Sequence, residues 1–300
     1  MTRDGRPTGI LLVDKPAGPT SHDVVAAVRR ALGTRRAGHF GTLDPFATGL
    51  LVCGVGPATR LALHATAHGK TYRATFRLGW TSSTDDVEGD LAPVTEATPP
   101  DRGGIERALE GWIGAVEQTP PAFSAKHVAG QRAYARARRG EPVLLQPIAV
   151  EIRSIEIEGY RWPDLEVRVE CGPGTYLRAL ARDLGAALGT GGYCHALRRL
   201  RSGPFDVGAA IAWHELGSAA ADALRSAAEA VADLPRIDLG PAEAAAAAGG
   251  RAVPAGGLEA PGWVALFGPG GFLGVGETVD DADETWVRPR RVLYPEGEGR

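Results

Sequence analysis

Alternation of apolar and polar residues predicts the strands of this chain. The clearest case is the segment from Thr71 to Leu78, where every second residue is apolar, and residues 165–171 repeat the pattern. Because successive side chains of a strand point to opposite faces of a sheet, both segments predict half-buried strands. Residues 10–13 and 148–157 are two further segments that we interpret as strands.

Helical spacing of apolar residues predicts the helices between these strands. One helix follows a cap at Thr20 or Ser21, a second covers residues 105–113, and a third runs from a cap at Thr175 to about Leu188. Each combines an apolar stripe with a polar face, as expected for a helix that covers a sheet. Strands and helices in this arrangement indicate the α+β class.

The last third of the chain changes character. The alanine-rich residues 213–234 predict a helical region, and residues 235–254 have the composition of a boundary. Three short apolar segments then predict strands, at residues 263–267, 272–275 and 286–293. We therefore expect a first domain over residues 1–235 and a small β-rich second domain over residues 236–300.

The densest group of chemically informative residues lies at positions 38–51. The sequence there, GHFGTLDPFATGLL, surrounds one carboxylate, Asp44, with glycines, threonines, a histidine and a proline. So many breaking residues predict an irregular loop. Asp44 before Pro45 fits the cap of a short helix over residues 47–51, and it also fits a catalytic carboxylate held by a glycine-built loop. The local pattern leaves both interpretations open.

The composition is that of an ordinary globular protein. Of the 300 residues, 44% are hydrophobic and 23% are charged, and the longest apolar runs fall far short of the roughly 18 residues that a membrane helix requires. The polar start of the chain predicts no signal peptide, and we expect a cytoplasmic protein without membrane association. Cys53, Cys171 and Cys194 are widely spaced and indicate no metal site.

Positive charge is clustered although the net charge is −3. Nearly all of it is arginine, which suits bidentate contact with phosphate and stacking on bases. Within residues 118–142, arginines surround Tyr134, which is typical of a segment that grips RNA, although local packing of Tyr134 is an alternative. The clusters occupy residues 29–36, 132–139, 198–201 and 288–291.

Short motifs along residues 9–205 resemble, in the right order, those of the tRNA pseudouridine synthase B (TruB) family. The loop motif GHFGTLDPFATG at residues 38–49 is the longest. The others are LVDKP (12–16), KTY (70–72), PPAFSA (120–125), GQRAY (130–134), GTYLR (174–178) and LRR (197–199). The resemblance implies a pseudouridine synthase fold, with a mixed, largely antiparallel sheet flanked by helices. It also implies a C-terminal domain similar to the RNA-binding PUA domain, from its position and the PRR at residues 289–291.

The resemblance implies an isomerase that converts uridine 55 in the TΨC loop of tRNA into pseudouridine, without a cofactor or a metal. The expected partner is the T-arm stem-loop of tRNA with no obligate protein partner, and assistance with tRNA folding is compatible with this role. Asp44 would be the catalytic residue. It would attack the anomeric carbon, attack C6 of the base or deprotonate the ribose, and the sequence does not choose among these routes.

The resemblance also implies roles for the binding residues. The target uridine must leave its stack, and Tyr72 would stack on the flipped base while Tyr176 packs beneath. Arg178 would pair with Asp44 and keep it ionised. The other expected site residues are Lys15 supporting the loop, His39 in the space that the nucleotide vacates, Leu197 lining the base pocket, and Arg132, Arg136 and Arg199 contacting RNA. Taken without the resemblance, core packing suits Tyr72, Tyr176 and Leu197.

Three competing functions remain at this point. A guide-RNA-dependent relative would work inside a ribonucleoprotein, but TSSTDDVEGD at residues 81–90 resembles the stand-alone bacterial form. An RNA-binding or tRNA-folding module would need no catalysis. A glycoside hydrolase would need a second carboxylate, and none accompanies Asp44 in these motifs. Phe123 and His127 stand where the family usually has tyrosine and lysine, which concerns individual RNA contacts in the arm of residues 118–142.

Overall fold

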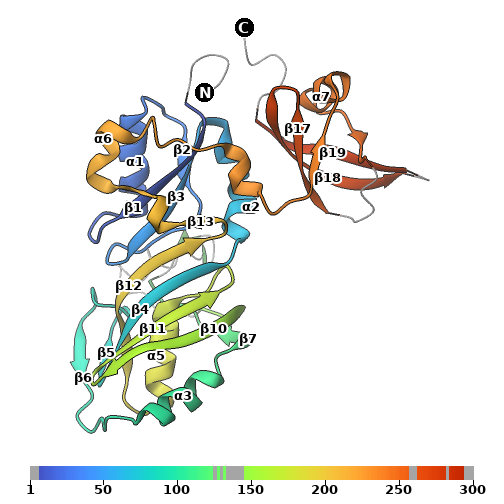
Figure 1. Ribbon diagram of the computed structural model, residues 1–300. Coiled ribbons are helices and arrows are strands. Elements are labelled where there is room, and N and C mark those ends of the chain that lie inside the picture. The colour runs from blue at the N-terminus through green and yellow to red at the C-terminus, as the bar shows by residue number, and fades with distance from the viewer. Residues whose placement is uncertain are drawn as a thin grey trace.

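The computed structural model describes residues 7–123, 127–128, 131–132, 145–256, 262–281 and 284–293. These residues form a large unit built on a mixed sheet and a smaller unit built on a five-stranded sheet (Figure 1). Strands and helices occur together in both units, which confirms the α+β class. No helix in the described ranges has the length and apolar character needed to cross a membrane.

The main sheet has the strand order β14-β1-β3-β12-β4-β11-β10-β7, with β13 attached to β12 and β2 attached to β3. The β1–β14 and β12–β3 pairs are parallel and the other described pairs of this sheet are antiparallel, so the predicted mixed, largely antiparallel sheet is confirmed. Its strands are β1 (Gly9–Lys15), β2 (Ala37–His39), β3 (Thr48–Val55), β4 (Lys70–Leu78), β7 (Gly114–Gln118), β10 (Ile148–Arg161), β11 (Asp164–Cys171), β12 (Gly192–Ser202), β13 (Phe205–Asp206) and β14 (Ile211–Ala212).

Helices cover one face of the main sheet. Val24 of α1, Leu109 of α3 and Leu180 of α5 belong to one buried cluster with residues of β3, β4 and β11. Thr20 caps α1 through its side chain, as predicted, whereas α3 begins earlier than expected because Asp101 caps it. The remaining elements of the large unit are α1 (Ser21–Ala31), α2 (Ala62–Ala67), α3 (Arg102–Glu110), α5 (Leu177–Ala187), α6 (Leu216–Ala219), and the paired strands β5 (Trp80–Ser82) with β6 (Leu91–Pro93) and β8 (His127–Val128) with β9 (Gln131–Arg132).

The prediction of a helix over residues 47–51 is wrong, because β3 begins at Thr48 and contains residues 48–51. This strand lies between β1 and β12, and both of its faces are covered. Leu51 packs into the cluster beneath the helices, and Leu50 packs into a second cluster on the opposite side. A strand buried on both faces carries a continuous apolar run, which resembles a short buried helix in sequence.

Two other expectations also change. Thr175 does not cap α5; Tyr176 is the cap residue, and the Thr175 hydroxyl instead donates to the carbonyl of Gly172. Residues 213–234 contain only α6 and short 3₁₀ turns rather than a continuous helical region.

The smaller unit begins within the stretch expected to be a boundary. Its sheet has the order β15-β17-β18-β19-β16 and is accompanied by α7. The bounds are β15 (Arg236–Asp238), α7 (Pro241–Ala248), β16 (Val253–Pro254), β17 (Trp263–Gly268), β18 (Gly271–Asp281) and β19 (Glu284–Val292). The three segments predicted to be strands near the C-terminal end are therefore strands.

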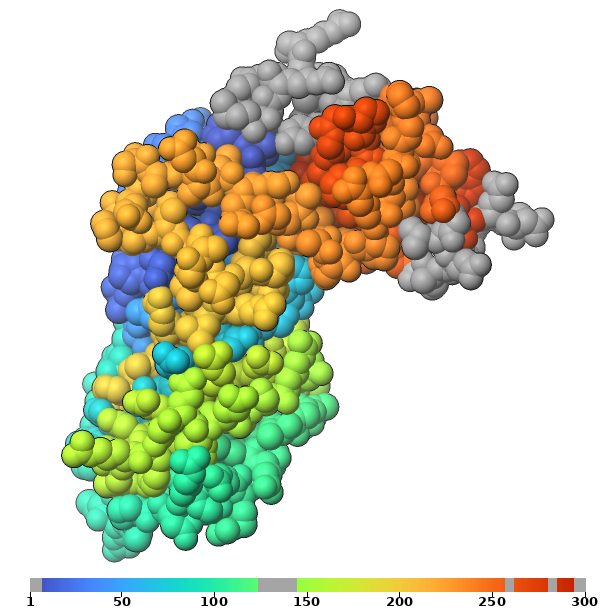
Figure 2. All heavy atoms as spheres, in the orientation of Figure 1, coloured from blue at the N-terminus to red at the C-terminus, as the bar shows by residue number. Residues whose placement is uncertain are grey.

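The two units pack on each other through apolar and aromatic contacts. Ala265 and Val275 of the smaller unit share a buried cluster with Leu61 of the larger one. The ring of His64 meets the ring of Trp263 edge-on, with 4.4 Å between centroids. Figure 2 shows the smaller unit, in orange and red, standing to one side of the larger unit.

Candidate active site

The loop between β2 and β3 carries Asp44 and contains no helix, so Asp44 is not a helix cap. Lys15 holds this loop through hydrogen bonds, and its side chain is completely buried. The Lys15 ammonium donates to the carbonyls of Pro16, Pro19 and Pro45 at 2.9, 2.8 and 3.0 Å. Burial lowers the pKa of Lys15 to about 8, and the attraction of Asp44 opposes that shift. Lys15 therefore supports the loop, as predicted.

Arg199 forms a second anchor and corrects an expectation. It was expected to contact RNA, but it is only 1% exposed. Its guanidinium donates to the carbonyls of Leu50, Thr42 and Gly41 at 2.7, 3.3 and 3.1 Å. These bonds occupy the charged group within the protein, so Arg199 holds both ends of the loop instead of presenting its charge to a ligand.

Gly49 lets β3 and β12 approach closely at this anchor. Its φ of 97° lies in the left-handed region, which glycine adopts without steric cost. A Cβ atom at this position would lie 2.3 Å from the carbonyl oxygen of Arg199. Gly49 therefore has a specific steric function at this anchor, and Ser21 adds a third anchor through hydrogen bonds to both backbone groups of Leu43.

Arg178, in the first turn of α5, lies at the centre of the site. Its Nε is 3.0 Å from Oδ2 of Asp44, which confirms the predicted ion pair. Its Nη1 is 3.0 Å from Oδ2 of Asp86 and donates to the carbonyl of Thr84. Its Nη2 donates to the carbonyl of Phe123 at 2.8 Å. One guanidinium therefore connects the Asp44 loop to the segment after β5 and to the start of the arm.

Asp86 is a site residue that the sequence analysis missed. Its side chain is 5% exposed, and its carboxylate also accepts from the Thr84 hydroxyl and the backbone N–H of Glu88. In the sequence it stands in an acidic run that is typical of a solvated loop, and only Thr84 before the acids and Gly89 between them indicate a folded turn. Asp86 is thus a second acid near Asp44, outside the motifs described above, but its carboxylate is buried and paired with Arg178, whereas a glycoside hydrolase requires a second carboxylate that reaches the sugar.

The surroundings of Asp44 act on its ionisation in opposite directions. Burial raises the pKa of the carboxyl, the Arg178 guanidinium lowers it, and the charge of Asp86 raises it again, with a net upward shift. About a third of the Asp44 side chain, 34%, stays exposed, so a ligand from solvent can reach it. Among the described residues, no group of three or more acidic, histidine or cysteine side chains is placed to hold a metal ion.

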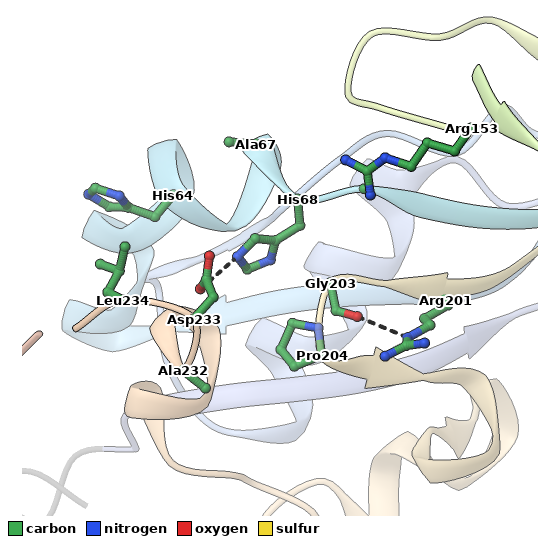
Figure 3. A pocket seen from close by; sticks show the side chains of 11 residues that line it. His64, Ala67, His68, Arg153, Arg201, Gly203, Pro204, Ala232, Asp233 and Leu234 are labelled. Carbon is green, nitrogen blue, oxygen red and sulfur yellow. Dashed lines mark hydrogen bonds and ion pairs between the residues drawn. The ribbon is translucent and has the colours of Figure 1, made fainter. Parts of the chain in front are cut away.

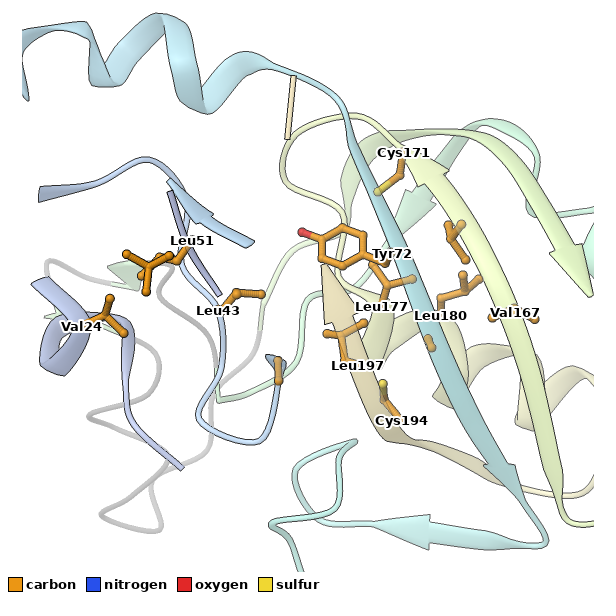
Figure 4. Packing of buried hydrophobic residues seen from close by; sticks show 14 of the residues in the cluster. Val24, Leu43, Leu51, Tyr72, Val167, Cys171, Leu177, Leu180, Cys194 and Leu197 are labelled. Carbon is orange, nitrogen blue, oxygen red and sulfur yellow. The ribbon is translucent and has the colours of Figure 1, made fainter. Parts of the chain in front are cut away.

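Tyr72 and Leu197 line the side of the site formed by the main sheet. They lie on the neighbouring strands β4 and β12 and are 7% and 9% exposed. Figure 4 shows the phenol oxygen of Tyr72 pointing from β4 toward the side on which Leu43 lies, with Leu177 and Leu197 nearby. Burial raises the pKa of Tyr72, and Arg199 opposes the shift. The phenol is therefore neutral at neutral pH.

Tyr176 is half-buried and is held through its backbone. Its carbonyl accepts from the side-chain amide of Gln118, and its N–H donates to the oxygen of the same amide at 2.8 Å. Gln118 is fully buried at the end of β7, where the expected arm begins. This double hydrogen bond fixes the start of α5, and with it the position of Arg178.

His39 lies at the end of β2, next to the loop. Its Nδ1 is buried and has no hydrogen-bond partner among the described residues. Burial lowers the pKa of His39 to about 4, and the nearby His22, whose ring centroid is 5.6 Å away, also disfavours its charged form. His39 is therefore neutral at neutral pH and retains an unused polar atom. The side chain of Arg132 and all of Arg136 lie outside the described residues.

Comparison with known proteins gives consistent matches over most of the chain. Residues 29–177 match a family described as "TruB family pseudouridylate synthase (N terminal domain)". Residues 178–246 match "tRNA pseudouridylate synthase B C-terminal domain", and residues 235–293 match "Pseudouridine synthase II TruB, C-terminal".

Relatives and solved structures agree with these matches. The tRNA pseudouridine synthase B of Thermobifida fusca is 46% identical over 88% of this chain and 92% of its own length. That of Cutibacterium acnes is 52% identical over 68% and 70%. A Cbf5-Nop10-Gar1 complex contains a chain of similar structure, with a TM-score of 0.76, 26% identity and coverage of 98% of this chain and 89% of that one. An H/ACA RNP bound to a substrate RNA has a TM-score of 0.75 at 24% identity, covering 96% and 86%, which shows the shared fold alone.

Proposed function

Because this chain belongs to the TruB family of pseudouridylate synthases, we propose that it isomerises uridine 55 in the TΨC loop of tRNA to pseudouridine. The observation that carries the proposal is the pairing of Asp44 with Arg178 at 3.0 Å in a loop anchored from several sides. A carboxylate held in this way is preorganised, and preorganisation is the main means by which a site without a cofactor accelerates a reaction.

The reaction requires one bond to break and another to form. The N1–C1′ bond of uridine breaks, the base turns, and a C5–C1′ bond forms; C5 loses its proton and N1, which carried the ribose before, gains one. Asp44 is the proposed catalytic residue, because its carboxylate is both ionisable and accessible. Attack at C1′, attack at C6 and removal of a ribose proton all remain compatible with this geometry.

The neighbouring residues have distinct proposed roles. Tyr72 and Leu197 provide an apolar wall for the flipped base. Tyr176 is proposed to pack beneath the base. A flipped base loses its stacking partners, so contact with an aromatic ring offsets part of that cost. A neutral Tyr72 accepts no proton by itself at neutral pH, so its hydroxyl relays or orients the C5 proton rather than acting as a phenolate base.

Arg178 and Asp86 position Asp44. The guanidinium is only 4% exposed and carries charge opposite to both carboxylates. It favours the ionised form of Asp44 against the effect of burial, while Asp86 and the backbone carbonyls fix its orientation. Lys15 and Arg199 hold the loop, and His39 is proposed to occupy the space that the flipped nucleotide leaves.

We assign catalysis to residues 1–235 and auxiliary RNA binding to residues 236–300, with residues 118–142 as an RNA-contacting arm. The proposed substrate is the T-arm stem-loop of tRNA, bound without an obligate protein partner in the cytoplasm. The Thr81-to-Asp90 segment supports stand-alone activity, because it supplies Asp86 to the site from this chain itself.

Mapping the product tests the proposed substrate. The purified protein is incubated with an unmodified tRNA transcript and no other RNA, and pseudouridine is located by carbodiimide labelling and primer extension. Modification at position 55 alone is expected, with a transcript carrying cytidine 55 as the control. Modification elsewhere, or only after addition of a guide RNA, would contradict the proposal.

A further inference from the structure

A groove with a basic lining runs between the large unit and the linker to the smaller unit. It consists of two adjoining pockets of about 630 and 230 Å³. Both pockets are lined by Gly69, Arg153, Arg201 and Gly203, so they form one continuous depression. Figure 3 shows Arg153 and Arg201 approaching the groove from different strands, with His68 and Asp233 farther along it.

The cations of this basic groove are largely free to bind a ligand. Among the residues that the structure describes, no carboxylate forms an ion pair with Lys70 or Arg201; Lys70 donates to two backbone carbonyls and Arg201 to that of Gly203. Arg153 pairs with Glu151 at 3.1 Å, but both side chains are more than half exposed. Exposed pairs of this kind contribute little free energy and exchange partners readily.

The acids of the basic groove offset only part of this charge. Asp233 is paired with His68 at 3.2 Å, and Glu170 is the other acid that lines either pocket. The two pockets are thus lined by three basic side chains and two acids, and Glu151, which pairs with Arg153, is a third acid beside them. The lining itself therefore has a small basic excess, although the chain as a whole has a net charge of −3.

One end of the basic groove lies beside the candidate active site. Lys70 begins β4, two residues before Tyr72. A Cβ atom placed on Gly41 of the Asp44 loop would lie 3.8 Å from Cε of Lys70. The other end reaches Asp233 and Leu234, immediately before the smaller unit. The basic groove therefore leads away from the Asp44 loop toward the smaller unit.

We propose that this basic groove binds the phosphodiester backbone of the substrate RNA stem, with Arg153 and Arg201 as the phosphate-contacting residues. The inference rests on the proposed function, because a flipped uridine stays joined to its stem and the backbone must leave the site along the protein surface. A guanidinium matches two phosphate oxygens with its fork of N–H donors. The glycines allow close approach: a Cβ on Gly69 would lie 2.9 Å from Nη1 of Arg153.

The test compares RNA binding by the double variant Arg153→Ala/Arg201→Ala with that of the wild type. Binding of a T-arm stem-loop RNA is measured between roughly 50 and 200 mM salt, where phosphate contacts dominate the salt dependence. Loss of two contacts should weaken binding about tenfold or more at the lower salt and reduce the slope of log affinity against log salt by roughly 1.4–1.8. Arg102→Ala/Arg107→Ala on α3 removes the same charge from an exposed helix as a matched control.

A second measurement identifies the ligand as the RNA backbone. Single phosphates of the stem-loop are replaced by uncharged methylphosphonates, and binding to wild type and to the double variant is compared. At the positions that the basic groove contacts, the replacement should weaken binding by the wild type and have no effect on the double variant. Because these are binding measurements, they decide the proposal even if the wild type fails to form pseudouridine.

Three results would overturn the proposal. One is unchanged affinity and salt slope in the double variant. Another is an equal loss in the α3 control, which would indicate a general charge effect. The third is a methylphosphonate response that does not depend on Arg153 and Arg201. Thermal unfolding confirms that the variants are folded, and Arg153→Gln/Arg201→Gln replaces the double alanine variant if that variant is not.

Discussion

Nε of Arg178 lies 3.0 Å from Oδ2 of Asp44, and Nη1 of the same guanidinium lies 3.0 Å from Oδ2 of Asp86. The two carboxylates are 42 positions apart in sequence but share one cation, which is itself almost completely buried. The position and ionisation of Asp44 therefore depend on a buried cation that Asp44 shares with Asp86.

Replacing Asp86 with asparagine tests this dependence. The variant Asp86→Asn keeps the shape of the side chain but removes a charge that raises the pKa of Asp44. The acid limb of the pH–rate profile should move to lower pH, and the maximal rate should fall by about tenfold or more because Arg178 is held less firmly. Asp90→Asn, on the same loop but exposed, is the control. An unshifted acid limb in Asp86→Asn would contradict the role.

Tyr72 is expected to matter for chemistry more than for RNA affinity. The variant Tyr72→Phe keeps the ring that would stack on the base and removes the hydroxyl. Binding of the stem-loop should change little, while the single-turnover rate should fall by roughly 10²–10⁴, the usual effect of losing a proton-transferring group. Tyr160→Phe removes a hydroxyl elsewhere on the main sheet, where it donates to the carbonyl of Pro100. Equal single-turnover rates in Tyr72→Phe and Tyr160→Phe would contradict this role and would show that Tyr72 contributes only packing.

Lys15 should link the stability of the loop to pH. Burial lowers its pKa in the folded protein to about 8 from 10.5, so between these values the unfolded chain binds more protons than the folded one. The contribution of Lys15 to the free energy of unfolding therefore rises with pH across that window, by at most about 1.4 kcal/mol per pH unit.

Urea unfolding of the wild type and of Lys15→Met, measured from pH 7 to pH 10.5, isolates this effect. The variant should be less stable at pH 7, by about 1–3 kcal/mol, since the carbonyls of Pro16, Pro19 and Pro45 lose their hydrogen-bond donor. The pH-dependent difference between the two proteins should appear above pH 8. If the free energies of unfolding of the two proteins changed in parallel from pH 7 to pH 10.5, Lys15 would not titrate as the structure indicates.

Local sequence patterns are sufficient to predict much of the fold. The alternation from Thr71 to Leu78 and the cap at Thr20 report interactions within a few residues, and β4 and α1 follow them. The β3 strand was missed because its apolar run is explained only by neighbours on both faces, which lie elsewhere in the sequence.

The same limit applies to the site. Arg198 and Arg199 are adjacent in β12 and look alike in sequence, yet they face opposite ways: Arg198 pairs with Asp14 and is partly exposed, whereas Arg199 is buried under the Asp44 loop. Asp86 was hidden within an acidic run because its burial depends on Arg178, 92 residues later. The family resemblance predicts Asp44 and Arg178 as site residues. The residues that hold them in place are visible only in the contacts of the folded chain.

The most direct test of the account is tritium release from a T-arm stem-loop labelled at C5 of uridine, comparing the wild type with Asp44→Asn. Both proteins should bind the RNA with similar affinity, because Asp44 lies in the reaction centre and contributes no positive charge to binding. The account predicts release by the wild type and none above background by Asp44→Asn. Equal release by the two proteins would contradict it and would make Asp44 a structural residue of its loop.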